Sequence, residues 1–254
     1  MEKMHFNLVT DQFGPRADDY VKSLVHAQGP DLSALEHVAS CAKPDRALDM
    51  GAGGGHVSYA MARHAKEVTA CDISDDMLSA IGTASQEKGF ANIKIVRAPA
   101  EQLPFEDSAF DFVASRYSAH HWRDFRRGIS EARRVLEPGA TAVFVDVVSA
   151  GEPMHDVHLQ AVELLRDPSH IRDYSPSEWM WTLAHAGFRV RRTDTWKIRM
   201  DFPVWIKRMR TPEKHVVAIR SLQAGAAKEI RDFFAIEEDG SFLLDVALFE
   251  AEGV

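Results

Sequence analysis

Four glycines close together, at positions 51, 53, 54 and 55, constrain the fold of this chain more than any other feature. They follow the strand-like run 47–50 and lead into the segment 54–64, in which apolar residues recur with helical spacing. Glycines between a strand and a helix let the backbone turn tightly and approach a ligand, toward which the helix directs free N–H groups. The pattern predicts a ligand-binding strand–loop–helix unit; a tight turn without a ligand is the alternative.

The segments after this loop alternate between strand-like and helix-like patterns. Helices between strands produce right-handed crossovers and a parallel sheet covered on both faces. Ligands of such sheets bind at the carboxyl ends of the strands. We therefore expect an α/β, Rossmann-like, doubly wound sheet. Its first five strands are predicted at 47–50, 67–72, 93–98, 110–116 and 140–148.

The pattern changes after residue 150. Helices are expected near 155–166, after the capping box that begins at Ser175, and near 212–222 and 226–234; strands are expected at 188–200 and 241–250. The last strand is apolar on both faces, which predicts a place inside the sheet and not at its edge.

Composition narrows the function classes. The formal net charge of −8 argues against broad nucleic-acid binding, and 45% hydrophobic residues argue against disorder. Cys41 and Cys71 cannot form a disulfide framework, and no dense Cys/His cluster is present, so no metal is expected. The chain has no apolar run long enough for a membrane span or a signal peptide, so a cytoplasmic location is expected.

An acidic residue, Asp72, ends the second strand, where a carboxylate can accept both hydroxyls of a ribose. Ser74 is the expected cap of the helix that follows, and a role for Asp72 as a helix cap or surface carboxylate is the alternative. A dinucleotide fingerprint would place a third glycine at position 56, where this chain has His56. This departure disfavours a nicotinamide oxidoreductase.

The loop instead reads D-x-G-x-G-x-G from Asp49, which resembles the first motif of the class I S-adenosylmethionine (SAM) methyltransferases. The resemblance implies a seven-stranded sheet with the last strand antiparallel, and SAM as cofactor. It also implies cofactor contacts along the sheet edge and from the amino-terminal segment, where Phe13 and Tyr20 either cover the cofactor or have a plain packing role. The implied cofactor-binding residues are Asp49, Gly51, Ala52, Gly53, Gly55, Asp72, Ile73, Met77, Pro99, Ala100, Glu101, Arg116 and Tyr20.

Further motifs extend the resemblance. Residues 98–105 are similar to the adenine-reading segment G-D-A-E-x-L-P-F, with Ala98 and Pro99 replacing its first two residues, and residues 131–139 match E-x-x-R-V-L-x-P-G. The chain looks closest to ubiquinone and menaquinone C-methyltransferases and their uncharacterised bacterial relatives. The stretches 166–179 and 205–208 are similar to those relatives.

His120 and His121, which follow the fourth strand, are the candidates for a general base or for positioning the substrate. A purely structural role is their alternative. Arg116 could contact the methionyl carboxylate or serve in an ion pair. The basic stretch 207–210, with Arg189, Arg191 and Arg192, is either a solvated face or a pocket for an acidic substrate.

We expect one domain over 1–254, with a SAM-binding core at 46–148 and lid elements at 1–30, 151–174 and 201–236. The expected reaction is in-line transfer of a methyl group to a small molecule; a quinone-biosynthesis C-methyltransferase and a non-catalytic SAM-binding regulatory module are the alternatives. The aromatic residues Trp179, Trp181, Phe202 and Trp205 suggest a partly apolar or planar acceptor. The sequence leaves open whether the protein forms a homodimer.

Overall fold

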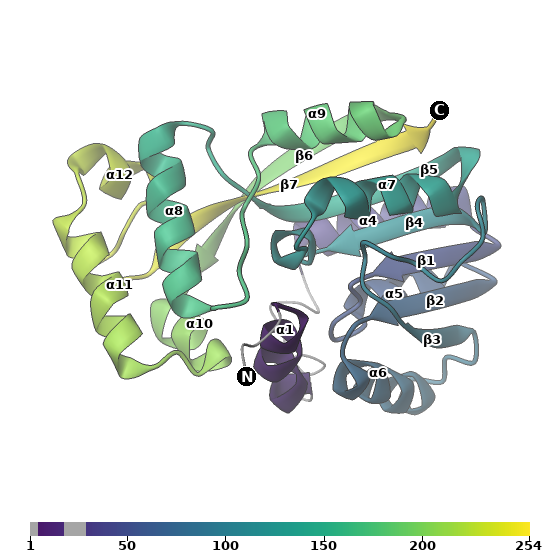
Figure 1. Cartoon of the computed structure of the whole chain (residues 1–254), viewed down its shortest axis with the longest axis horizontal. Coiled ribbons are helices and arrows are strands. Elements are labelled where there is room, and N and C mark those ends of the chain that lie inside the picture. Colours follow the sequence, from purple (N-terminus) through teal and green to yellow (C-terminus); the bar gives the residue numbers. More distant parts are fainter. Residues whose placement is uncertain (1–4, 18–28) are drawn as a thin grey trace.

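Seven strands form a single sheet in the computed structural model, which describes residues 5–17 and 29–254. The strand order is β3-β2-β1-β4-β5-β7-β6 (Figure 1). The strands are β1 (Arg46–Met50), β2 (Glu67–Asp72), β3 (Ile93–Arg97), β4 (Phe110–Arg116), β5 (Leu136–Val148), β6 (Phe188–Met200) and β7 (Phe242–Gly253).

The last strand, β7, lies between β5 and β6 and runs antiparallel to both. The first five strands pair in parallel, with β1 at their centre between β2 and β4. β7 is apolar on both sides because both of its faces are covered; Leu248 and Phe249, which point to opposite faces, are fully buried. The predicted doubly wound fold with an antiparallel last strand is confirmed.

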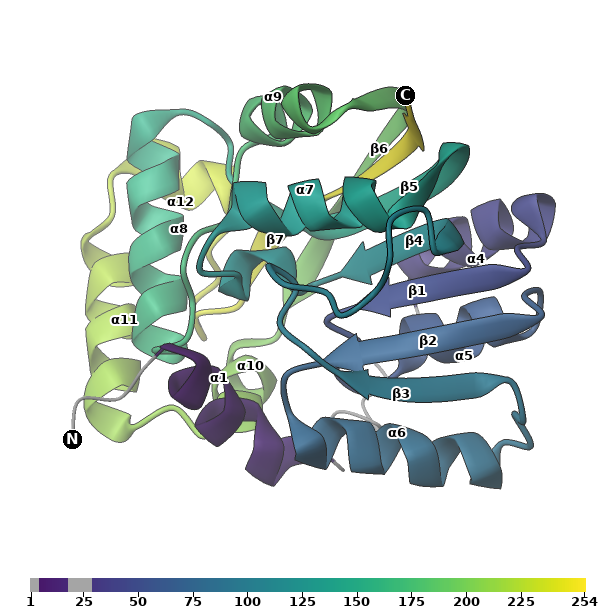
Figure 2. The ribbon, with the colours of Figure 1, turned by 45° about the vertical axis from the view of Figure 1, so that its right-hand side comes forward.

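Helices cover both faces of the sheet (Figure 2). Two predicted caps are confirmed: Ser74 accepts a hydrogen bond from the Met77 N–H, and Ser175 forms a capping box with Glu178. The helices are α1 (His5–Phe13), η1 (Gly14–Arg16), α4 (Pro30–Ala42), α5 (His56–Ala62), α6 (Asp75–Glu87), η2 (Ala119–His121), α7 (Phe125–Val135), α8 (Pro153–Arg166), α9 (Pro176–Ala186), α10 (Phe202–Met209), α11 (Glu213–Gly225) and α12 (Lys228–Phe233).

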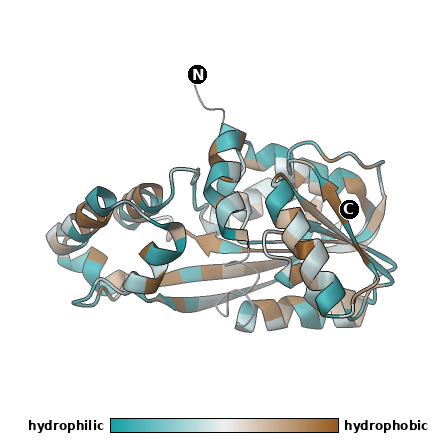
Figure 3. Ribbon diagram, turned by 90° about the horizontal axis from the view of Figure 1, so that it is seen from below, coloured by the Kyte–Doolittle hydropathy of each residue, from teal (hydrophilic) through white to brown (hydrophobic). Residues whose placement is uncertain are grey.

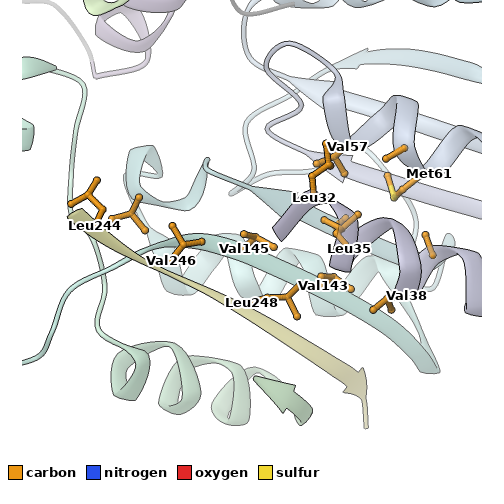
Figure 4. Packing of buried hydrophobic residues seen from close by; sticks show 14 of the residues in the cluster. Leu32, Leu35, Val38, Val57, Met61, Val143, Val145, Leu244, Val246 and Leu248 are labelled. Carbon is orange, nitrogen blue, oxygen red and sulfur yellow. The ribbon is translucent and has the colours of Figure 1, made fainter. Parts of the chain in front are cut away.

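Each face of the sheet has its own apolar core. On one face, α4 and α5 pack Leu35 and Met61 against residues of β5 and β7 such as Val143 and Leu248 (Figure 4). On the other face, Trp179 of α9 is fully buried between α7 and the sheet. The helices mix hydrophobic and hydrophilic residues in Figure 3, as amphipathic helices do.

A helical cluster, which consists of α8, α10, α11 and α12, lies beyond the central strands, beside the ends of β6 and β7 (Figures 1 and 2). The segment α10 was not predicted as a separate helix; Asp201 caps it by accepting a hydrogen bond from the Val204 N–H. Among the described residues, no helix is both long and apolar enough to cross a membrane.

Candidate active site

A first cavity lies at the carboxyl ends of β1, β2 and β4, where parallel sheets bind their ligands. Its walls come from the glycine loop, the ends of these strands, the segment after β3, and α1. The lining residues are Phe6, Val9, Phe13, Asp49, Gly51, Ala52, Gly53, Gly54, His56, Val57, Asp72, Ile73, Ser74, Met77, Ala98, Ala100, Glu101, Arg116, Tyr117, Ser118, His121 and Trp122.

The glycine loop is shaped by left-handed backbone at Gly51 (φ +69°) and Gly53 (φ +50°). A Cβ at Gly51 would lie 1.8 Å from the Ser118 Oγ, so no side chain fits there. A Cβ at Gly53 would meet nothing within 4 Å. The loop therefore leaves open space where its backbone faces the cavity.

The carboxylate of Asp72 is fixed by backbone donors. The Gly53 N–H donates to its Oδ2 and the Ser74 N–H donates to its Oδ1, each at 2.9 Å. Burial raises the pKa of Asp72, and these hydrogen bonds act in the opposite direction. Because each carboxylate oxygen can accept more than one hydrogen bond, Asp72 can also accept hydroxyl donors from a ligand.

Asp49 is the second carboxylate of this cavity. Its Oδ2 accepts a hydrogen bond from the Ser58 Oγ at 2.6 Å. Burial, with a smaller contribution from the negative charge of Asp72, raises the pKa of Asp49 to about 7. A cationic group placed in the cavity would favour the ionised form of this side chain.

Ten of the predicted cofactor-binding residues line this cavity: Asp49, Gly51, Ala52, Gly53, Asp72, Ile73, Met77, Ala100, Glu101 and Arg116. Gly55 does not; it is buried, and a Cβ there would lie 2.7 Å from the Tyr59 hydroxyl, so its small size serves packing. Pro99 is also absent from the lining. Tyr20 falls outside the described residues.

Apolar side chains of α1 were not assigned to the site individually, apart from Phe13. Phe6, Val9 and Phe13 line the cavity together. They are three and four residues apart, a spacing that places them on one face of a helix. This periodicity is the signal that could have identified Phe6 and Val9.

Arg116 forms a buried ion pair. Its Nε donates to the Asp31 Oδ2 at 2.5 Å, and both side chains are less than 5% exposed. The pair joins the end of β4 to the first turn of α4. The ion-pair alternative for Arg116 thus describes its position, although the residue also reaches the cavity wall.

A second cavity of about 550 Å³ adjoins the first, a volume typical of small-molecule sites. Phe13, Tyr117 and His121 line both cavities. Tyr117 has φ +52°, which is unusual for a residue other than glycine and is typical of functional sites. The remaining walls come from β6, β7, α8, α10 and the loop 167–173.

The two predicted histidines have opposite charge preferences. Burial alone would lower the pKa of His120, but the carboxylate of Asp146, 2.6 Å from its Nδ1, outweighs burial and raises the pKa to about 9. Burial and the neighbouring charge of His120 lower the pKa of His121 to about 4. His120 is therefore positively charged and His121 neutral near pH 7.

Among the described residues, His120, Asp146 and Asp173 form a group with metal-ligand spacing, since one ligand atom of each lies within 4.8 Å of the others. Asp146 is already engaged by the His120 Nδ1, the His120 N–H and the Val147 N–H. These hydrogen bonds account for the positions of His120 and Asp146 without an ion, and the absence of a metal stays a prediction.

Several residues expected near the acceptor lie elsewhere. Trp179 is buried in the core, and Trp181 is half-exposed on the outer face of α9; Trp205, in contrast, lines the second cavity. Arg191 pairs with Glu252, and Arg192 pairs with Asp194 on the exposed side of β6. These two arginines belong to a solvated face, not to a substrate pocket.

Comparisons with known proteins agree with this architecture. Residues 48–144 match a family model described as a methyltransferase domain. The chain is 41% identical over 197 residues to the uncharacterised protein YafE of Escherichia coli (78% of this chain, 95% of YafE). It is 34% identical over 224 residues to the uncharacterised methyltransferase YcgJ of Bacillus subtilis (88% of each chain). The crystal structure of YcgJ superposes with a TM-score of 0.83 over 88% of this chain and 97% of that one, at 31% identity.

The chain is more distantly similar to the demethylmenaquinone methyltransferase of Clavibacter sepedonicus. The two are 33% identical over 122 residues, which cover 46% of this chain and 49% of the enzyme. The extended matches to YafE and YcgJ, together with the glycine loop, Asp72 and the strand order, determine the family. This chain belongs to the class I SAM-dependent methyltransferases.

Proposed function

We propose that the protein transfers the methyl group of SAM to a small molecule, with SAM in the first cavity and the acceptor in the second. The observation that carries this proposal is the pair of adjoining cavities, which meet at Phe13, Tyr117 and His121. Methyl transfer requires a donor and a nucleophile that face each other across a short gap without water between them. Two cavities with a shared wall supply that arrangement.

The residues of the first cavity fit SAM. The fixed carboxylate of Asp72 suits the ribose hydroxyls, and the open backbone at Gly53 leaves room for a ligand beside it. Met77 and Ala100 give an apolar surface for adenine. Asp49 can balance a positive charge in the same cavity. These features support SAM over a neutral or strongly anionic ligand.

SAM, when bound, supplies a methyl group on a positively charged sulfur, so the electrophile comes with the cofactor. The protein must exclude water and orient the acceptor. The α1 residues Phe6 and Phe13 cover the first cavity, and Arg16, just after α1, donates to the Met209 carbonyl of α10 at 2.8 Å. This bridge supports a lid role for residues 5–16 together with the helical cluster.

His121 is the best candidate for the general base, because it lines both cavities and is neutral near pH 7. His120 lines only the second cavity and is held in its protonated form by Asp146. We assign His120 to positioning: its ring lies against that of His121, with ring centroids 4.1 Å apart.

Calorimetry with SAM, S-adenosylhomocysteine and NADH tests the cofactor assignment. We expect one-to-one binding of the first two compounds and none of NADH. Methylation of a compound from a small-molecule extract by radiolabelled SAM would then establish turnover. A folded protein that binds neither SAM nor S-adenosylhomocysteine would contradict the proposal.

The quinone-biosynthesis alternative has weaker support. The similarity of this chain to the demethylmenaquinone enzyme covers only 46% of the chain. The second cavity, which would select the acceptor, has several charged residues on its walls. A quinone ring with a long apolar tail does not require such a wall.

A further inference from the structure

Two carboxylate oxygens on the wall of the second cavity have no hydrogen-bond partner among the described residues. They are the Oδ2 atoms of Asp167 and Asp173, whose side chains are each 2% exposed. The Oδ1 of Asp167 is satisfied by the N–H and the hydroxyl of Ser169. A buried carboxylate oxygen without a donor is costly, so a donor is expected to reach it when the site is occupied.

The ring of His121 adds a third acceptor to this wall. Its Nδ1 lies 3.2 Å from the Ser169 carbonyl oxygen, which can only accept, so the Nδ1 carries the proton. The Nε2 is then an acceptor, and it lies 3.9 Å from the Oδ2 of Asp167. Two acceptors that face each other at this distance leave a place for a group that donates to both.

Two neighbouring acidic residues already have partners. Asp146 holds His120, and Glu163 lies 3.4 Å from the guanidinium of Arg166. The Nε2 of His170 lies 3.9 Å from the Oδ2 of Asp173, and burial holds the pKa of His170 near 2, so this ring is neutral. Burial raises the pKa of Asp173 well above its usual value, and the positive charges of His120 and Arg166 act in the opposite direction. Within the described part of the chain, the side chains paired with the two Oδ2 atoms are the neutral rings of His121 and His170, so a cationic ligand would favour the ionised form of Asp173.

We propose that the methyl acceptor is a protonated amine whose N–H groups donate hydrogen bonds to the Oδ2 atoms of Asp167 and Asp173 and to the Nε2 of His121. This inference rests on the proposed function. An ammonium group has three donors and a positive charge, which matches three acceptors and two carboxylates; a hydroxyl offers one donor and no charge. The chemistry of the wall thus selects an amine.

The transfer step follows from the same contacts. The ammonium gives one proton to the Nε2 of His121, and the imidazolium that forms faces the carboxylate of Asp167, which stabilises it. The freed lone pair of nitrogen forms the N–C bond. The C–S bond breaks, its electron pair stays on sulfur, and a neutral thioether and a methylated ammonium result.

Binding of two probes of nearly equal shape tests the proposal in protein saturated with S-adenosylhomocysteine. Benzylamine is cationic, and benzyl alcohol is neutral. We expect benzylamine to bind at least about tenfold more tightly. Asp167→Asn and Asp173→Asn each keep the side-chain shape and should remove most of this preference, with little effect on benzyl alcohol.

Glu137→Gln is the matched control, because it removes one negative charge at the amino end of β5, where Glu137 forms an exposed pair with Arg46. It should leave the preference unchanged. Binding of S-adenosylhomocysteine to each variant, measured in the same titrations, shows that the variant is folded.

Equal binding of the two probes, or no benzylamine binding at millimolar concentration, would overturn the amine assignment while leaving the proposed function intact. Tight binding of Mn²⁺ that Asp173→Asn abolishes would assign these oxygens to a metal and would also overturn it. A wild-type protein that does not bind S-adenosylhomocysteine would instead contradict the proposed function itself.

Discussion

The two cavities are constructed in different ways. The first is formed largely by a local motif that recurs along the chain, a strand followed by a short loop. Asp49, Gly53 and Asp72, which line this cavity, are therefore close together in the sequence. The second joins distant segments, as when His121 contacts the Ser169 carbonyl or Arg166 donates to the Trp205 carbonyl. The donor side thus depends on backbone shape and the acceptor side on long-range side-chain pairs.

The largest expected effect concerns backbone shape in the first cavity. Gly51→Ala would place a Cβ against Ser118 at a positive φ, which we expect to abolish binding of S-adenosylhomocysteine and to lower the free energy of unfolding by about 3 kcal/mol. Gly89→Ala is the control: its φ is also positive (+76°), but no atom lies within 4 Å of the added Cβ. Calorimetry and denaturant unfolding measure both, and similar losses in the two variants would contradict the steric explanation.

The next effect tests a long-range pair. Asp31→Asn removes the carboxylate charge that pairs with the buried guanidinium of Arg116, which should lower the free energy of unfolding by about 3 kcal/mol. Asp45→Asn removes an exposed pair with Lys66 and should cost about 0.5 kcal/mol or less. Urea unfolding compares them; equal costs would mean that burial of the Asp31–Arg116 pair has no energetic consequence.

A smaller effect separates the ribose role of Asp72 from a general charge effect. Asp72→Asn should weaken binding of S-adenosylhomocysteine about tenfold or more, because a charged acceptor is lost. Asp75→Asn is the control, because Asp75 is exposed and pairs with Arg97; it should leave the affinity for S-adenosylhomocysteine unchanged. An unaltered affinity in Asp72→Asn would remove Asp72 from the cofactor site.

A further effect appears in the pH dependence of stability. The pKa of His120 is raised from 6.5 to about 9 in the folded protein by Asp146, so its contribution is complete below about pH 6.5 and is lost as the pH rises through 9. The free energy of unfolding should fall between about pH 7 and pH 9. This slope should decrease in His120→Asn and persist in the control His185→Asn; an unchanged slope in His120→Asn would assign it to another group.

The sequence predicted the first cavity better than the second for a physical reason. Glycine spacing, Ser74 as a cap and Asp72 after β2 are local signals that act within one strand–loop–helix unit. The partners of His120 and His121 are not local: Asp146, Asp167 and Ser169 come from later segments, and only packing brings them together. The same reason explains why Trp179 and Trp181 were expected at the acceptor side and lie elsewhere.

The central claim is that the methyl donor and the acceptor occupy adjoining cavities of this fold. A crystal structure of the complex with S-adenosylhomocysteine tests it most directly. We predict ribose hydroxyls on the carboxylate of Asp72 and the sulfur atom at the junction lined by Phe13, Tyr117 and His121. A complex in which the sulfur points away from this junction, or in which the ligand lies outside the first cavity, would contradict the account.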